Sequence, residues 1–262
     1  MSVETLTPTD AVVRRGADAW FAAARHMLRF EWANLRPWAA MTLIVQIMMG
    51  VGMAVMYGFF YPDVDDLTAL LITTGVPTLA LVPLGFVLVP SGVAQQKVAG
   101  TYDFIWSLPV PRSAQVTASF LLNSALALPG TVLALVVGAW TYGVDLSLSW
   151  VLLPAVLLSA VMCVAVGYGI AMLVDNALVI NLVTNATVFL VLLFTPIVYP
   201  ASNLPAAMER MHEVLPFYPM AQIIRAGLTD GVVTNVGASF LTVALWAVAG
   251  TAVTAWSVTR RR

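Results

Sequence analysis

Side chains able to do chemistry are few in this chain, and one segment concentrates them. Residues 100–115, GTYDFIWSLPVPRSAQ, hold an acid, an arginine, two prolines and three aromatic side chains between two long uncharged runs. A short helix over residues 98–108 is expected, stopped by Pro109. Aromatic anchors with a polar rim are typical of protein-binding surfaces, but the same residues also suit a loop held at a membrane surface by its rings. Both interpretations are open on composition alone.

Patterns for catalysis and metal binding are missing from the sequence. A phosphate-binding P-loop needs a lysine followed by serine or threonine, whereas Val98 follows Lys97, the only lysine. Glu209, His212 and Glu213 could bind a cation, but zinc needs three or four converging ligands, and a solvated helix face explains the same spacing. We therefore predict no catalytic residue, no metal site and no cofactor in this chain.

Four amide side chains interrupt the apolar runs and are the predicted lining of a translocation path. Asn181 and Asn185 share a helix face because they are four residues apart, and Gln46 and Asn123 lie in two earlier runs. In lipid such groups face protein or water, so they either line a path or hydrogen-bond neighbouring helices. No charged residue lies near the centre of an apolar run, which disfavours proton- or sodium-coupled secondary transport.

The elements that must position these residues are membrane helices. The chain has 262 residues, 60% hydrophobic and 10% charged, with a mean hydropathy of +0.90, whereas soluble domains carry about 25% charged residues. Six charge-poor windows each exceed the roughly 20 apolar residues that span a bilayer. We predict an all-α polytopic membrane protein. Its six transmembrane helices are expected at residues 38–60, 68–92, 115–142, 148–173, 177–199 and 235–258.

The basic residues orient these predicted helices. Ten of the twelve Lys and Arg residues fall on one side of the predicted topology, whereas Arg210 and Arg225 fall on the other. Cytoplasmic segments of membrane proteins are enriched in Lys and Arg. We therefore predict a multi-pass protein of the cell inner or plasma membrane with both termini in the cytoplasm.

Two regions flank or interrupt the six helices. Residues 1–36 are predicted as a cytoplasmic tail and an amphipathic interfacial helix, although a positively charged anchor with tryptophans at headgroup level explains the same residues. Residues 37–262 are predicted as the six-span domain, with a cytoplasmic loop at 95–115. Prolines divide residues 200–230 into pieces too short to span, so short re-entrant helices are predicted between spans five and six.

Two stretches resemble the ABC transporter type-2 permease family. The run QQKVAGTYDFIWSLPVPRSAQVTAS is similar to the family's cytoplasmic loop, and SNLPAAMERMHEVLPFYPMAQIIRAGLTDG is similar to its outer segment after span five. In that family the cytoplasmic loop is the coupling helix, which docks into a groove of the ATP-binding subunit. With its aromatic neighbours included, the predicted coupling residues are Gly100, Thr101, Tyr102, Asp103, Phe104, Trp106 and Arg112.

The resemblance implies the permease subunit of an ATP-driven exporter, working as a homodimer with two ATP-binding subunits that hold ATP and magnesium. The expected cargo is amphipathic or hydrophobic, a drug-like molecule or a lipid. The alternatives are a polysaccharide or glycolipid exporter, and an ATP-independent channel or secondary carrier. Membrane lipid is an expected partner and nucleic acid is not. Many family members carry Glu-Arg-Glu before the Gly-Thr, where this chain has QQKVA at residues 95–99, so docking is expected to rely more on aromatic side chains than on charge.

Overall fold

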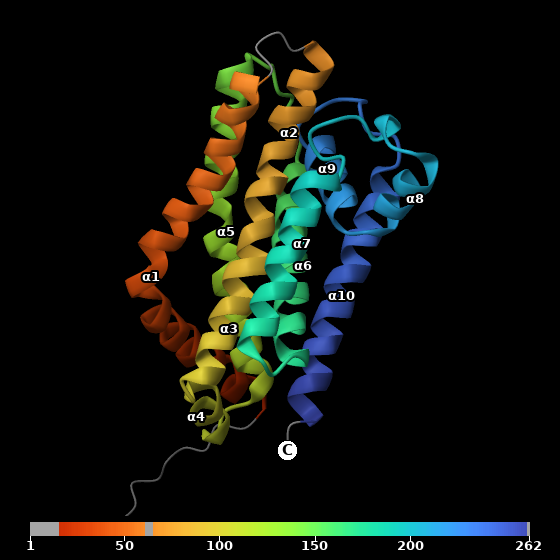
Figure 1. Ribbon diagram of the computed structural model, residues 1–262. Coiled ribbons are helices and arrows are strands. Elements are labelled where there is room, and N and C mark those ends of the chain that lie inside the picture. Colours follow the sequence, from red (N-terminus) through yellow and green to blue (C-terminus); the bar gives the residue numbers. More distant parts are fainter. Residues whose placement is uncertain (1–15, 61–64, 261–262) are drawn as a thin grey trace, which may run out of the picture.

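The computed structural model describes residues 16–60 and 65–260 as a bundle of helices, and these residues form no strand (Figure 1). Within them, six segments are long and apolar enough to cross a membrane. The predicted all-α membrane fold is thereby confirmed. The six segments are Ala17–Phe60, Asp66–Val98, Arg112–Tyr142, Leu152–Leu173, Ala177–Phe194 and Val236–Arg260.

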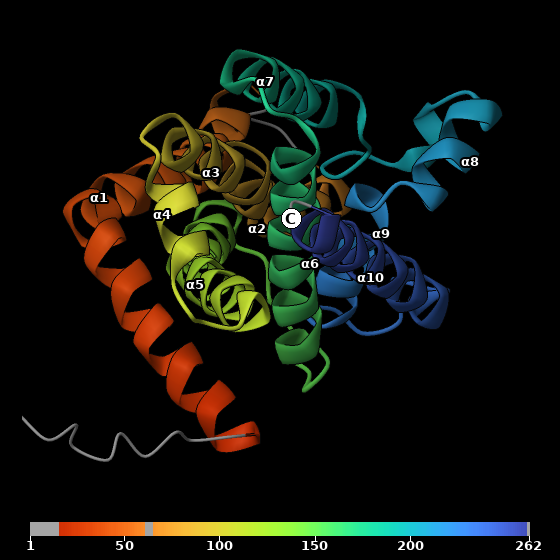
Figure 2. The same cartoon turned by 90° about the horizontal axis from the view of Figure 1, so that it is seen from below.

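Helix α1 (Ala17–Phe60) is continuous across the predicted boundary between the interfacial segment and the first span. Pro37 lies inside it, and helices bend at proline because the ring removes an N–H donor and crowds the preceding turn. Figures 1 and 2 show α1 bending, with its N-terminal part turned across one end of the bundle. There Met27 packs with Ile105 and Ala118. The predicted interfacial helix and first span are therefore two arms of one helix.

The second span lies at the centre of the bundle. It is built from α2 (Asp66–Pro83), a π-helical turn η1 (Leu84–Leu88) and α3 (Val89–Val98). Of its apolar window, 89% is buried, against 17% for the sixth span. The π-helical turn falls where Pro90 has no N–H to donate to the turn before it. The second span is thus packed against protein, whereas the first, third, fifth and sixth spans leave most of their apolar windows exposed.

The remaining spans are α5 (Arg112–Tyr142), α6 (Leu152–Leu173), α7 (Ala177–Phe194) and α10 (Val236–Arg260). Helix α7 ends five residues before its predicted end, because Thr195 precedes Pro196 and a residue before proline is held extended. Helix α6 packs closely on the π-helical turn. A Cβ on Gly167 would lie 1.8 Å from the carbonyl oxygen of Gly85, and a Cβ on Gly85 would lie 2.4 Å from Cβ of Cys163, so the two backbones approach this closely only because both residues are glycine.

A 3₁₀ turn and two short helices lie between spans five and six, at η2 (Ala201–Asn203), α8 (Ala206–Val214) and α9 (Phe217–Ala226). A proline directly precedes both α8 and α9, where its fixed φ angle suits the entry into a helix. Helix α9 packs on α2, α6 and α10 with Met220 and Ile223 fully buried. Helix α8 lies beside the bundle (Figures 1 and 2). The short helices predicted in this segment are therefore present.

The two ends of the bundle carry different elements. Helix α4 (Thr101–Ser107) lies at the same end as the last turn of α10 and the N-terminal arm of α1, and we call this the α4 end (Figure 1). Helices α8 and α9 lie at the opposite end, called the α9 end. The two loop regions singled out in the sequence are therefore separated by the length of the spans.

Candidate functional site

Helix α4 begins at a glycine and ends before a proline. Gly100 closes α3 in the left-handed conformation, with φ of 71°, which glycine adopts without strain. Its carbonyl accepts the N–H of Phe104 at 3.1 Å, and half-buried Thr101 is the first helical residue. Leu108 is extended before Pro109 and ends the helix. The helix is therefore shorter than predicted at its start and ends one residue before Leu108.

The side chains of α4 divide between two faces. Tyr102 and Ile105 are three residues apart and are 2% and 3% exposed, so this face packs into the bundle. Asp103 is exposed, and Phe104 is 59% exposed. Trp106 belongs to α4, but its side chain lies outside the described part of the structure. Of the predicted aromatic side chains, Tyr102 thus points inward and Phe104 outward.

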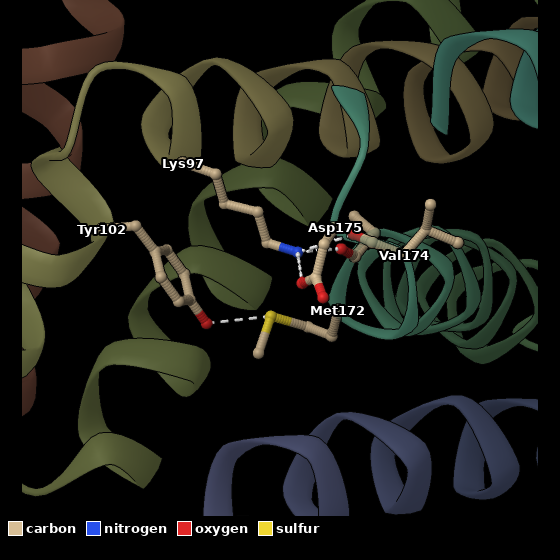
Figure 3. A network of polar contacts seen from close by, with 6 residues as sticks. Lys97, Tyr102, Met172, Val174 and Asp175 are labelled. Atoms are coloured by element: carbon tan, nitrogen blue, oxygen red, sulfur yellow. Dashed lines mark hydrogen bonds and ion pairs between the residues drawn. The ribbon is translucent and has the colours of Figure 1, made fainter. Parts of the chain in front are cut away.

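The buried face of α4 is attached to the C-terminal end of α6 (Figure 3). The Tyr102 hydroxyl donates to Sδ of Met172 at 2.8 Å. Lys97, at the end of α3, donates from Nζ to the carbonyl oxygens of Ala171 and Val174 at 2.6 and 2.8 Å. The last carbonyls of a helix lack partners within it and carry the negative end of its dipole, so they favour a cation. Lys97 and Tyr102 together fix α4 relative to α6.

Backbone carbonyls contribute more to the position of Lys97 than its carboxylate neighbour does. The ammonium lies 3.8 Å from Oδ1 of Asp175, whose side chain is 82% exposed, whereas the Lys97 side chain is 11% exposed. An ion pair open to water contributes about 0–1 kcal/mol. A hydrogen bond from a charged donor contributes about 1.5–3 kcal/mol. The two carbonyl bonds of Lys97 therefore dominate.

Arg112 opens α5 and binds the end of a different span. Its Nη1 donates to the carbonyl oxygen of Val258 in the last turn of α10, and its side chain is half-buried. Helices α6 and α10 in turn pack backbone to backbone, since a Cβ on Gly250 would lie 2.7 Å from the carbonyl carbon of Ala165. Lys97 and Arg112 thus bracket α4, and each bonds the carbonyl end of a different span. A contact between Arg112 and another subunit stays a prediction.

Two of the four predicted path residues, Gln46 and Asn123, lie on α1 and α5, and Gln46 lies where these helices pack. Gln46 is 1% exposed and donates from Nε2 to the carbonyl oxygen of Ala127 at 3.0 Å, with Gly130 against its side chain. Asn123 lies one turn earlier on α5 and donates to the Ser119 carbonyl of its own helix at 2.9 Å. Gln46 therefore joins two helices, whereas Asn123 is satisfied within one.

The other two path residues lie on α7. Oδ1 of Asn181 accepts the Ser91 hydroxyl of α3 at 2.8 Å. Asn185 is exposed and donates to the Asn181 carbonyl of its own helix at 2.7 Å. Asn181 therefore bridges α3 and α7, whereas Gln46 bridges α1 and α5. Lining of a path by these four amides stays a prediction.

Arg225 of α9 is a buried charge, whereas in the sequence it stands out only as one of two basic residues on the opposite side of the predicted topology. It is 3% exposed, and Nε donates to the Thr74 hydroxyl at 2.9 Å while Nη2 donates to the Ile197 carbonyl at 2.8 Å. Burial lowers the pKa of its guanidinium to about 10, so the group is protonated at neutral pH. A lone arginine in an otherwise apolar helix was the available signal, but its partners are a hydroxyl and a carbonyl remote in sequence.

The sequence matches the family model of the ABC-2 type transporter over residues 22–229, well over half of the chain. The chain belongs to the ABC-2 type transporter family. No curated protein matches its sequence. The matched residues extend from α1 to just beyond α9 and include α4 and all four amides. As an ABC-2 permease it is a transport subunit in the membrane and is not itself catalytic, and the family implies an ATP-binding partner.

Proposed function

We propose that this ABC-2 permease is the membrane subunit of an ATP-driven exporter, and that α4 is its contact with the ATP-binding subunit. The division of α4 into two faces is the observation that carries the proposal. Phe104 and Asp103 face outward at an end of the bundle, whereas Tyr102 on the opposite face is fixed to α6. An exposed aromatic ring beside a charge suits a docking contact, and a buried face bonded to a span suits the transmission of force.

A displacement of α4 has two direct routes into the membrane. One passes through Lys97 and Tyr102 to the end of α6, and the other passes through Arg112 to the end of α10. On the partner subunit, binding and hydrolysis of ATP with magnesium supply the free energy. Alternating access then requires only two packings of the spans that differ by a few kcal/mol, which the partner biases.

The proposed assembly is a homodimer with two ATP-binding subunits, in the inner or plasma membrane. The α4 end faces the cytoplasm in this proposal. In support, the basic residues of the α1 arm, of the α4 region and of the last turn of α10 belong to elements at this end. Cytoplasmic segments favour such residues. Both termini are accordingly assigned to the cytoplasm.

The proposed cargo is amphipathic or hydrophobic. Near the centres of the apolar runs the polar side chains are uncharged, and those of Gln46 and Asn181 are engaged in bonds between helices. Such a lining offers hydrogen bonds without fixed charge. This chemistry supports a drug-like molecule or a lipid as the exported cargo.

The test is the ATPase activity of the ATP-binding subunit purified with this permease in lipid. Phe104→Ala is expected to weaken assembly and to lower ATPase activity, because it removes the outward ring of α4. Phe21→Ala is the matched control, since Phe21 is 66% exposed on the α1 arm at the same end, compared with 59% for Phe104. Equal loss in both variants would remove α4 from the contact. Solute transport by the permease alone, with no ATPase bound, would replace the exporter by a channel or carrier.

A further inference from the structure

A polar cavity lies at the α9 end, the end opposite to α4. Its volume is about 440 Å³, within the roughly 300–1,000 Å³ of small-molecule sites. It is enclosed by the end of α8, by α9 and by the first turns of α10 with the residues that precede them. The polar side chains that line it include Glu213, Tyr218, Gln222, Asn235, Ser239 and Thr242.

The lining suits a neutral ligand with several hydroxyl groups. Among the described residues that line the cavity, Glu213 is the one ionisable acid and none is Lys or Arg. A phosphate or carboxylate ligand would find no cationic side chain in this lining to pair with, and it would lie beside the Glu213 carboxylate. The amides and hydroxyls provide donors and acceptors side by side, the Glu213 carboxylate can accept from two hydroxyls of a ligand, and Tyr218 adds a ring. This combination is complementary to a sugar group.

An apolar stripe on α10 begins next to the cavity. Ala238 and Thr242 line the cavity. Leu241, Leu245 and Val248 follow at helical spacing on the neighbouring face and are 61%, 59% and 65% exposed. A ligand with its polar group in the cavity can therefore lay an apolar tail along α10, within the membrane-spanning part of the helix.

The wall of the cavity is connected to the core of the bundle. Gln222 and Tyr218 hydrogen-bond each other, and Nη1 of Arg225 donates to Oε1 of Gln222 at 3.4 Å. Arg225 also binds Thr74 of α2 and the Ile197 carbonyl after α7. A ligand that contacts Gln222 and Tyr218 is thereby linked through one arginine to the central span.

We propose that this cavity binds the neutral, hydroxyl-rich sugar group of an amphiphile at the α9 end. The assignment of that amphiphile as the exported cargo rests on the proposed function, whereas binding itself does not. The sugar group has two sources, a glycolipid in the surrounding leaflet or a free saccharide in solution. The apolar stripe on α10 favours the lipid-attached form.

The experiment uses the full-length permease in phosphatidylcholine nanodiscs, without any ATP-binding subunit. Labelled monoglucosyl diacylglycerol is equilibrated between donor vesicles and either permease-containing or empty nanodiscs, and its accumulation is counted per permease. Hydrogen exchange of residues 213–222 and 232–242 is measured with glucosyl lipid, with free glucose, and with phosphatidylcholine alone. We expect the glucosyl lipid to accumulate and to slow exchange in both segments.

The variants separate binding from folding. The double variant Glu213→Ala with Thr242→Val removes two hydrogen-bonding groups. Because each hydrogen bond contributes about 1 kcal/mol, accumulation of the glucosyl lipid is expected to fall roughly five- to fiftyfold. Thr251→Val is the matched control, because Thr251 and Thr242 each donate to the carbonyl four residues earlier on α10, but Thr251 is not among the residues lining the cavity. The control is expected to bind as the parent protein does.

Each outcome decides one part of the proposal. If free glucose slows exchange as well as the glycolipid does, the sugar chemistry holds and the role of the α10 stripe is overturned. If neither sugar probe accumulates or alters exchange, or if Thr251→Val loses as much as the cavity variants, the site is overturned. Because no ATPase is present, these results are independent of the coupling experiment on Phe104.

Discussion

Replacement of Lys97 by methionine tests whether α4 is mechanically tied to α6. Methionine keeps most of the apolar stem and removes the ammonium, with its bonds to the Ala171 and Val174 carbonyls. Each such bond contributes about 1.5–3 kcal/mol, offset in part by the water that the buried ammonium has given up, so we expect a loss of about 2–4 kcal/mol. Without this donor, the carbonyls at the end of α6 must accept hydrogen bonds from water or lose them as the helix end frays.

The assay is hydrogen exchange at the end of α6, together with ATPase coupling. A loss of 2–4 kcal/mol accelerates exchange through local opening by about 30-fold to several hundredfold in residues 172–176. ATP hydrolysis by the assembled complex is expected to continue while transport falls, because α4 still docks but no longer moves α6. Asp175→Asn is the control, since its carboxylate is 82% exposed and 3.8 Å from the ammonium, and its expected effect is about 0–1 kcal/mol.

Two results would refute this reasoning. Unchanged exchange in Lys97→Met would mean that the carbonyl bonds do not hold the end of α6. An Asp175→Asn effect as large as that of Lys97→Met would mean that the ion pair, and not the carbonyl bonds, carries the attachment.

Two further predictions concern the α9 end. Arg225→Met removes bonds to Thr74 and Ile197 and is expected to lower the free energy of unfolding by about 2–3 kcal/mol, with Arg225→Lys restoring only part because the planar fork is lost; equal melting temperatures for all three proteins would contradict this. Burial lowers the pKa of His212, which a contact with the Phe194 carbonyl opposes. The folded protein thus favours the neutral ring. The contribution of His212 to the free energy of unfolding is therefore complete above the unfolded pKa of about 6.5, and it is lost as the pH falls below that value. A melting curve series between roughly pH 8 and 5 should show this loss in the parent and not in His212→Leu, and a parallel loss in both would assign it to other groups.

The spans could be predicted because lipid leaves the backbone few choices. A long uncharged run must satisfy its own N–H and C=O groups, and a helix does so. The end of α4 followed a local rule, since Pro109 holds Leu108 extended, whereas its start was predicted at residue 98, ahead of the left-handed Gly100. The end of α7 was misjudged because the predicted span ran through Pro196, although the extended conformation of Thr195 follows from that proline.

The attachments of the site could not be predicted in the same way. Lys97 was conspicuous as the only lysine, but its acceptors are backbone carbonyls over seventy residues away, and a carbonyl leaves no mark in a sequence. The spacing of Tyr102 and Ile105 shows that they share a face of α4. That this face packs inward depends on the position of α6 and α1, which only the folded chain supplies.

The contact between Gly85 and Gly167 divides α6 into two unequal arms. Gly167 lies six residues from Leu173 and fifteen from Leu152, so the two arms of α6 measure about 9 and 22 Å. If the helix tilts about this pivot, we expect a shift at its α4 end to be reversed in direction and enlarged roughly 2.5-fold at the other. The tip of the long arm rests on α9, since a Cβ on Gly227 would lie 2.5 Å from Cα of Leu152. Spin-label distances at both ends of α6, with and without nucleotide-driven closure, would show equal shifts if no such pivot exists. A small displacement of α6 at the α4 end would thus become a larger one where α6 meets the end of α9.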